Sequence, residues 1–127
     1  MRSLHAVLAA FMSTCLLSAC GPSLATRYET GNQALSTGDG AFYFLRISPA
    51  LQRALNDCIP SGTPGASPVL VLVADVDAHG VARNLVIEPR SPGTDCVAQR
   101  LTATPLPKPV LAPGAESFPI GLRIETK

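Results

Sequence analysis

Hydrophobic residues form two neighbouring runs in the middle of the chain, separated by a short polar turn. In the first run, odd-numbered valines (Val69 to Val73) alternate with apolar even-numbered residues (Leu70 to Val76), so both faces of a strand would be apolar. Such a strand belongs inside a sheet, with a neighbour on each side. Asp77 suits the first position of a type I turn, and Gly80 suits a position that needs positive φ. The pattern therefore predicts an antiparallel β-hairpin over residues 68–89.

Two helices are expected to flank this hairpin. Ser48 and Pro49 form a helix start, and a stripe of apolar residues then recurs at helical spacing up to Pro60. The stripe consists of Leu51, Ala54, Leu55, Cys58 and Ile59. After the hairpin, Thr94 or Asp95 can cap a second helix that ends near Thr104. Its buried side would carry Cys96, Val97 and Leu101.

A third strand is expected at the end of the chain. Phe118, Ile120, Leu122 and Ile124 alternate with Pro119, Gly121, Arg123 and Glu125. Pro119 indicates an edge strand. Because the first strand needs two neighbours, the strand order should be second, first, third. The fold class is thus α+β: a small two-layer α-β-β-α-β domain over residues 48–127, with a three-stranded antiparallel or mixed sheet and two helices on one face.

Residues 20–47 are expected to be a flexible tether that ends in an aromatic segment. The part over 21–40 is rich in Gly, Ser, Thr and Asn and has few large apolar residues. Residues 41–47 are strong strand formers, which could pair with the sheet or cover the core. A ligand-stacking surface is the alternative role for this aromatic segment.

The first 19 residues are typical of a secretory signal. The apolar run from Ala6 to Leu17 is shorter than the roughly 20 residues that a membrane-spanning helix needs. Leu-Ser-Ala-Cys, ending at Cys20, resembles a bacterial lipobox, which implies cleavage before Cys20 and lipid attachment to its thiol. Gly21 follows where an Asp would imply retention in the inner membrane, so we expect a lipid-anchored protein on the periplasmic side of the outer membrane. Ordinary signal-peptidase cleavage after Ala19, leaving Cys20 free, is the alternative.

Charge and cysteine content narrow the possible partners and chemistry. The 127-residue chain has a net charge of +1, with no basic cluster, which argues against a nucleic-acid partner. Cys15 leaves with the signal and Cys20 takes the lipid, so Cys58 and Cys96 remain as a pair in an oxidising compartment. We expect them to form a disulfide. Reduced core cysteines are the alternative, and a metal site at this pair has no supporting CxxC or histidine spacing.

Few residues are available for catalysis or for binding a cofactor. His79 is the only histidine after the signal, and it lies at the turn. Asp75 and Asp77 could share a cation, but two carboxylates are too few ligands, and Asp77 is needed to form the turn. We therefore expect no metal site, no cofactor and no enzymatic activity. A small periplasmic hydrolase is a distant alternative.

The order helix, strand, strand, helix, strand over residues 48–125 resembles the C-terminal domain of the energy-transducing TonB proteins. The resemblance is carried by Asp75-Val76-Asp77, Gly80, residues 95–101, Leu106-Pro107-Lys108-Pro109 and Phe118-Pro119-Ile120. In some relatives each helix carries a cysteine of a pair, which agrees with Cys58 and Cys96. TonB proteins keep an uncleaved inner-membrane helix and a long proline-rich stretch, and this chain has a lipobox and a short tether instead.

The resemblance implies that partners bind at a sheet edge. That edge would be the outer side of the last strand, formed by Phe118, Ile120, Gly121, Leu122, Arg123 and Ile124. The sequence thus predicts a non-enzymatic envelope lipoprotein that binds an envelope protein or peptide. A lipoprotein component of a secretion or transport complex is the alternative.

Overall fold

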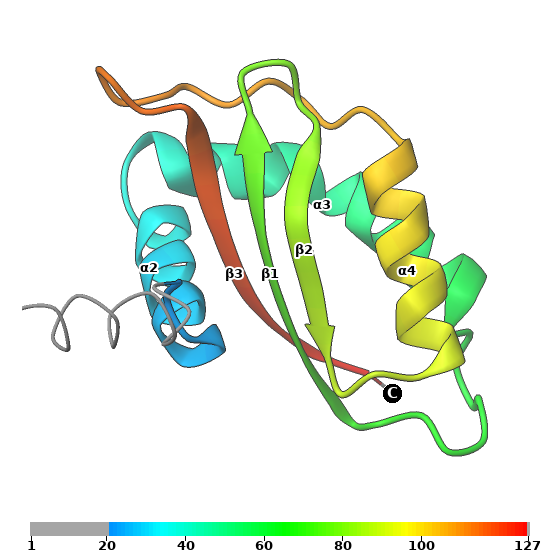
Figure 1. Ribbon diagram of the computed structural model, residues 1–127. Coiled ribbons are helices and arrows are strands. Elements are labelled where there is room, and N and C mark those ends of the chain that lie inside the picture. Colours follow the sequence, from blue (N-terminus) through cyan, green and yellow to red (C-terminus); the bar gives the residue numbers. More distant parts are fainter. Residues whose placement is uncertain (1–20, 127) are drawn as a thin grey trace, which may run out of the picture.

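A three-stranded antiparallel sheet with three helices forms the domain, as a computed structural model that describes residues 21–126 shows (Figure 1). The elements in chain order are α2 (Leu24–Ser36), α3 (Asp39–Cys58), β1 (Val69–Asp77), β2 (Ala82–Glu88), α4 (Pro92–Ala103) and β3 (Ser117–Glu125). The strand order is β2-β1-β3. The predicted α+β class and strand order are therefore confirmed.

The central strand β1 pairs along its whole length with β3 and through most of its length with β2. The turn between β1 and β2 forms as predicted, because the Asp77 Oδ1 accepts hydrogen bonds from the backbone N–H groups of His79 (2.9 Å) and Val81 (3.0 Å). Gly80 has a φ of 86°, which glycine adopts without strain. The β1–β2 ladder has one irregularity, opposite Asn84, whose φ is also positive (52°).

Helices α3 and α4 cover one face of the sheet. The even-numbered residues of β1 point toward them, and Leu70, Leu72, Ala74 and Val76 are all buried. A small apolar cavity of about 20 Å³ lies between the layers. Its lining comes from all three strands and from both helices, including Ile47 of α3 and Leu101 of α4. This arrangement is the predicted two-layer core.

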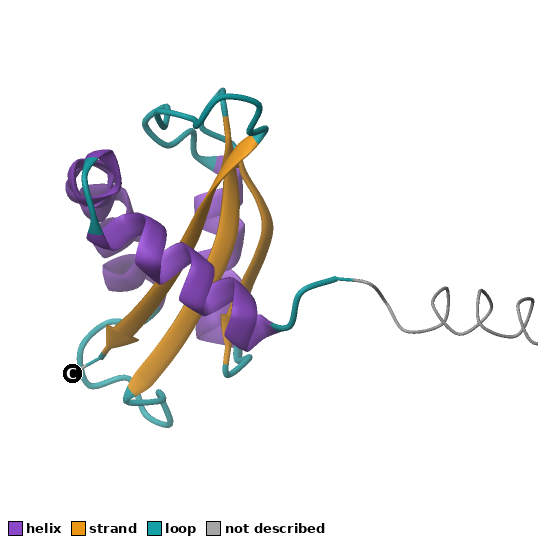
Figure 2. Ribbon diagram, turned by 90° about the vertical axis from the view of Figure 1, so that its left-hand side faces the viewer, coloured by secondary structure: helices purple, strands orange, loops and turns teal. Residues whose placement is uncertain are grey.

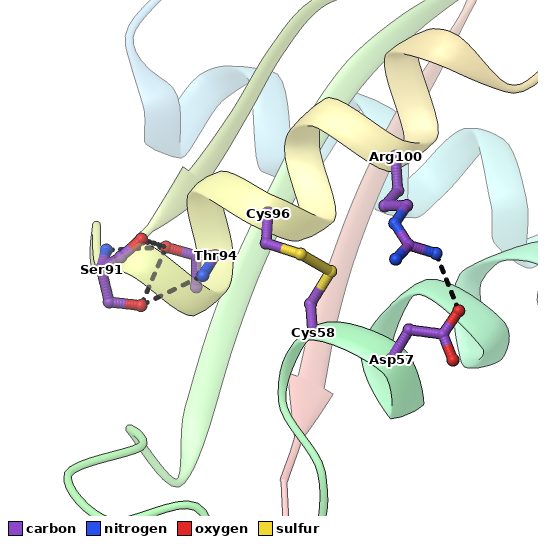
Figure 3. Close-up of a disulfide and its surroundings, with 6 residues drawn as sticks. All are labelled: Asp57, Cys58, Ser91, Thr94, Cys96 and Arg100. Atoms are coloured by element: carbon purple, nitrogen blue, oxygen red, sulfur yellow. Dashed lines mark hydrogen bonds and ion pairs between the residues drawn. A yellow bond between two sulfur atoms is a disulfide. The ribbon is translucent and has the colours of Figure 1, made fainter.

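A disulfide joins the two covering helices (Figure 3). Cys58, the last residue of α3, bonds to Cys96 in the first half of α4, with their Cα atoms 5.7 Å apart. Beside it, the Arg100 guanidinium donates to the Asp57 carboxylate at 2.9 Å. The predicted disulfide is therefore confirmed, and it fixes the end of α3 against α4.

The first covering helix begins earlier than predicted. Helix α3 starts at Asp39, after Gly38 with a φ of 55°, and Pro49 lies inside it. The predicted start at Ser48 is wrong, and so is a strand over 41–47. Pro49 removes one backbone hydrogen bond, yet it faces solvent, and the Ser48 hydroxyl donates to the carbonyl oxygen of Phe44 at 2.7 Å. Tyr43 and Ile47 are buried, so the aromatic segment does cover the core, as a helix.

The segment predicted as a flexible tether contains a helix that packs on the sheet. Helix α2 is capped by Ser23, whose hydroxyl oxygen accepts from the backbone N–H of Thr26 at 3.2 Å. Figure 2, which views the molecule from the β3 side, shows α2 crossing in front of the strands. Leu35, near its end, joins the core. The tether prediction for 21–40 is therefore wrong, and the domain extends to α2.

Candidate functional site

The two outer strands, β2 and β3, are the edges of the sheet, and only one of them was predicted as a binding site. Alternate residues of an edge strand direct their N–H and C=O groups outward. The backbone N–H of Thr126 donates to the carbonyl of Pro68 at 2.9 Å, which continues the β1–β3 ladder. Counting back along β3 in this alternation, Gly121 and Arg123 direct their backbone groups away from β1.

Helix α2 covers the outer side of β3 at Gly121. The Asn32 side-chain amide donates to the Gly121 carbonyl oxygen at 3.4 Å. The backbones of α2 and β3 touch at Gly31 and Gly121. A Cβ atom added to Gly31 would overlap the backbone of Ile120 and Gly121. A Cβ atom added to Gly121 would lie 2.9 Å from the backbone nitrogen of Asn32. An added strand cannot pair with β3 at a position that a helix already occupies.

The residues predicted to form the binding edge lie in different places. Phe118, Ile120, Leu122 and Ile124 face the core; Ile120 and Leu122 are buried, and Phe118 packs on Tyr43 with ring centroids 5.2 Å apart. Gly121 is beneath α2, and Arg123 alone is exposed. The prediction that β3 is an edge strand is confirmed. At Gly121 its outward carbonyl oxygen already accepts a hydrogen bond from Asn32, and partner binding along the rest of this edge stays a prediction.

The outer side of β2 is not covered by α2. In the β1–β2 ladder Val73 is opposite Val86 and Leu72 is opposite Ile87. Because Val73 directs its backbone groups toward β2, the alternation makes Val86 pair with β1 and leaves the N–H and C=O of Ile87 directed outward. Among the described residues, no other strand pairs with this side of β2.

A groove of about 260 Å³ runs beside this open edge, between β2 and α4. Three consecutive apolar residues of β2 line one wall, and α4 with the loop before it lines the other. The lining residues are Leu85, Val86, Ile87, Arg90, Thr94, Asp95 and Ala98. The groove is mainly apolar along the strand, and at one end the Arg90 guanidinium donates to the Asp95 carboxylate at 3.4 Å.

The start of α4, which forms part of this wall, is firmly capped. Ser91 and Thr94 form a capping box in which the Thr94 backbone N–H donates to the Ser91 hydroxyl (3.1 Å) and the Ser91 backbone N–H donates to the Thr94 hydroxyl (2.8 Å) (Figure 3). Together with the disulfide at Cys96, this capping fixes the helix wall relative to β2. A rigid wall would lower the entropy cost of binding a partner beside it.

A polar cluster fastens the start of α2 to the other face of the sheet, away from α3 and α4. The Arg27 guanidinium donates to the carbonyl oxygen of Asn84 at 2.6 Å and lies 3.7 Å from the Asp75 carboxylate. The Asn84 amide in turn donates to Asp75 at 3.3 Å. Asp75 is therefore engaged by an arginine and an amide, as part of the attachment of α2.

Asp77 and His79, the other candidates for chemistry, belong to the hairpin turn. The pKa of Asp77 is lowered, mainly by the backbone N–H of Val81 and also by Arg83 and the N–H of His79, in spite of some desolvation. Arg83 donates to the Asp77 carboxylate at 2.9 Å. In the part of the chain that the structure describes, no group of three His, Cys, Asp or Glu residues could hold a metal ion.

The signal segment and Cys20 lie outside the described residues. Within residues 21–126, no helix is both long and apolar enough to cross a membrane. Lipid attachment at Cys20 stays a prediction.

Sequence reasoning missed the β2 groove because it assigned the binding role to β3 alone. The predicted strand order already made β2 an edge, so a signal was present. The sequence pattern did not reveal α2, which covers the β3 edge at Gly121 and does not cover the β2 edge. Comparison of the chain with models of known families, with curated proteins and with solved structures found no match.

Proposed function

We propose that this protein is a non-enzymatic lipoprotein of the bacterial cell envelope that captures an extended segment of a partner protein. The segment adds to the sheet as a fourth strand beside β2. The observation that carries the proposal is the open edge of β2 with a preformed groove beside it. Main-chain hydrogen bonds to an edge strand supply affinity, and the pockets beside it supply specificity.

The contrast between the two edges supports the choice of β2. The outer side of β3 is covered by α2 at Gly121, which is a common way to protect an edge strand. Within residues 21–126 no strand or side chain bonds to the outward backbone groups of Ile87 on β2, and these groups stand next to the apolar wall of the groove. A partner segment with apolar side chains at alternate positions would direct every second side chain into the groove.

Site-specific photo-crosslinking in the producing cells tests this proposal. A photoreactive phenylalanine analogue at Ala98, which lines the groove, should give an adduct of defined mass with one envelope protein. The same analogue at Gln99, which is exposed on the same helix outside the groove, is the matched control and should give little adduct. Adducts of equal yield at the two positions, or a dominant adduct from Arg123 on β3, would refute binding at β2.

A second measurement examines the mode of binding. With the captured partner in hand, Ala98→Phe should fill the groove and weaken the complex, while Gln99→Phe should leave it unchanged. The amide of Ile87 should exchange its hydrogen more slowly in the complex, because it would donate to the added strand. An unchanged exchange rate at Ile87 would show that the partner does not extend the sheet.

Membrane attachment is tested separately. Cells that are fed a labelled fatty acid should incorporate the label into this protein, and Cys20→Ala should abolish the label. Label that persists in the Cys20 variant would contradict the lipoprotein part of the proposal and leave the β2 groove unaffected.

A further inference from the structure

The outer side of α3 carries the most exposed large apolar side chains among the described residues. Phe42 is 69% exposed and Leu45 is 66% exposed, and Val110 in the neighbouring connector is 65% exposed. Phe42, Leu45 and Pro49 recur at helical spacing, so they form a single stripe that faces away from the sheet. Large apolar side chains that are exposed together, and not singly, mark an interaction surface.

Cationic side chains lie beside this stripe and form no ion pair with an acidic residue of the described part of the chain. Of the eight arginine and lysine residues from Gly21 to Thr126, four form ion pairs with aspartates: Arg27, Arg83, Arg90 and Arg100. Three of the other four gather here, namely Arg46 and Arg53 on α3 and Lys108 in the connector. The Arg46 guanidinium donates to the Lys108 carbonyl oxygen at 3.5 Å, which joins the connector to the stripe. Asp57, four residues after Arg53, pairs with Arg100, and Asp39, in the first turn of α3, lies seven residues before Arg46.

We propose that this surface, the α3 stripe (Phe42, Leu45, Arg46, Pro49, Arg53), is a second docking site and binds an acidic amphipathic helix of a protein partner. Apolar side chains at helical spacing are the anchors by which one helix packs against another. Cations beside such anchors select a helix with carboxylates next to its apolar stripe, as charged flanking positions do in coiled coils.

The position of the stripe favours a protein over the membrane as its occupant. The start of α2 lies on the face of the sheet opposite α3, because Arg27 pairs there with Asp75 (Figure 2). An anchor at Cys20 would be separated from the α2 cap, Ser23, by about 10 Å of extended chain. With the lipid anchor of the proposed function, so short a link would hold the α2 side toward the membrane and direct the α3 stripe away from it. The inference is independent of the β2 groove, which lies between other elements.

A tryptophan reporter makes the test specific to the stripe, because the chain contains no tryptophan. One variant of the full chain carries Leu45→Trp. A second variant carries Gln99→Trp on α4 and is the control for a tryptophan outside the stripe. The probes are an acidic amphipathic peptide of about 14 residues, built of leucine and glutamate on a helical pattern, and a twin with lysine in place of glutamate. Vesicles of phosphatidylglycerol and phosphatidylethanolamine form the third probe.

The acidic peptide should shift the emission of the Leu45→Trp variant to shorter wavelength and saturate, and the emission of the Gln99→Trp variant should not respond. Arg46→Glu with Arg53→Glu should weaken this binding at least about tenfold and should create binding of the lysine twin. Both arginines are exposed, so these variants should keep the circular dichroism spectrum of the parent.

Three results would overturn the proposal. The first is no response to the acidic peptide up to about 1 mM. The second is equal binding of the two peptides by the parent, which would show that charge plays no part. The third is a blue shift with the vesicles and none with the acidic peptide, which would assign the α3 stripe to a membrane surface.

Discussion

Replacing Gly31 by alanine tests whether α2 is a built-in part of the domain. In an exposed helix interior, alanine is more favourable than glycine by about 1 kcal/mol. If α2 were a detached tether, Gly31→Ala would therefore leave stability unchanged or raise it. In the structure, however, the added methyl group would meet the backbone of Ile120 and Gly121, and a backbone cannot rotate aside as a side chain can.

The expected cost follows from what must move. Overpacking of this kind costs about 1–3 kcal/mol. To relieve it, α2 must shift away from β3, which stretches the hydrogen bond from Asn32 to the Gly121 carbonyl and loosens the cover over the face where Val73 is now fully buried. After subtraction of the gain in helix propensity, we expect a net loss of about 1 kcal/mol and a fall in Tm of roughly 5 °C.

Urea denaturation followed by circular dichroism measures this loss, and Gly93→Ala is the matched control. Gly93 also lies in a helix, but its added Cβ would meet the Ile59 side chain at 2.9 Å, and a side chain can adjust. Hydrogen exchange should locate the effect, with faster exchange of α2 amides in Gly31→Ala only. Equal stability of the two variants would refute the reasoning that α2 is packed on the β3 edge.

Three further predictions concern the core and the turn. Removing the disulfide by Cys58→Ser with Cys96→Ser should cost about 4 kcal/mol, because it frees a loop of 38 residues in the unfolded chain; equilibrium unfolding of both forms gives the difference. Burial raises the pKa of Tyr43 from 10.0 to about 12, with Arg46 opposing. Its contribution to stability, about 3 kcal/mol, is thus complete below pH 10 and lost as pH rises through about 12, and unfolding of Tyr43→Phe measured over this range should show no such loss. The lowered pKa of Asp77 stabilises the fold above pH 3.8, and this contribution disappears as pH falls through the folded pKa. Acid titrations should therefore show a shallower loss in Asp77→Asn than in the parent, and parallel curves would contradict the assigned role of the turn.

The central hairpin could be predicted because its signals are local. The alternation of β1 and the turn chemistry of Asp77 and Gly80 act within a few residues, and the turn forms as expected. A strand with two apolar faces requires two neighbours, and that requirement alone gives the order β2-β1-β3. The cysteine count was likewise sufficient, because Cys58 and Cys96 are the two cysteines left after the predicted signal and the predicted lipid site at Cys20, and they form the disulfide.

The start of α3 was placed wrongly because its local signals conflict. Ser48 and Pro49 have the chemistry of a helix start, and nothing in the sequence shows that the proline faces solvent, where a lost backbone bond costs least. The burial of Tyr43 and Ile47 against the sheet extends the helix through this point. Packing here outweighs a local signal for a helix start.

The sequence by itself determined the sheet, its two covering helices and the disulfide. Each depends on hydrophobic periodicity, on turn chemistry or on the number of cysteines in the chain. Only the tertiary structure decided which edge of the sheet is open. Helix α2 buries just Gly31 and Leu35 along its length, so its own pattern is too polar to predict a packed helix. Part of its packing is the close contact of Gly31 with Gly121, which are 90 positions apart in the chain, so no local pattern shows it. That contact covers the β3 edge at Gly121, and it is the reason why we propose the β2 edge, with its groove, as the place where another strand adds.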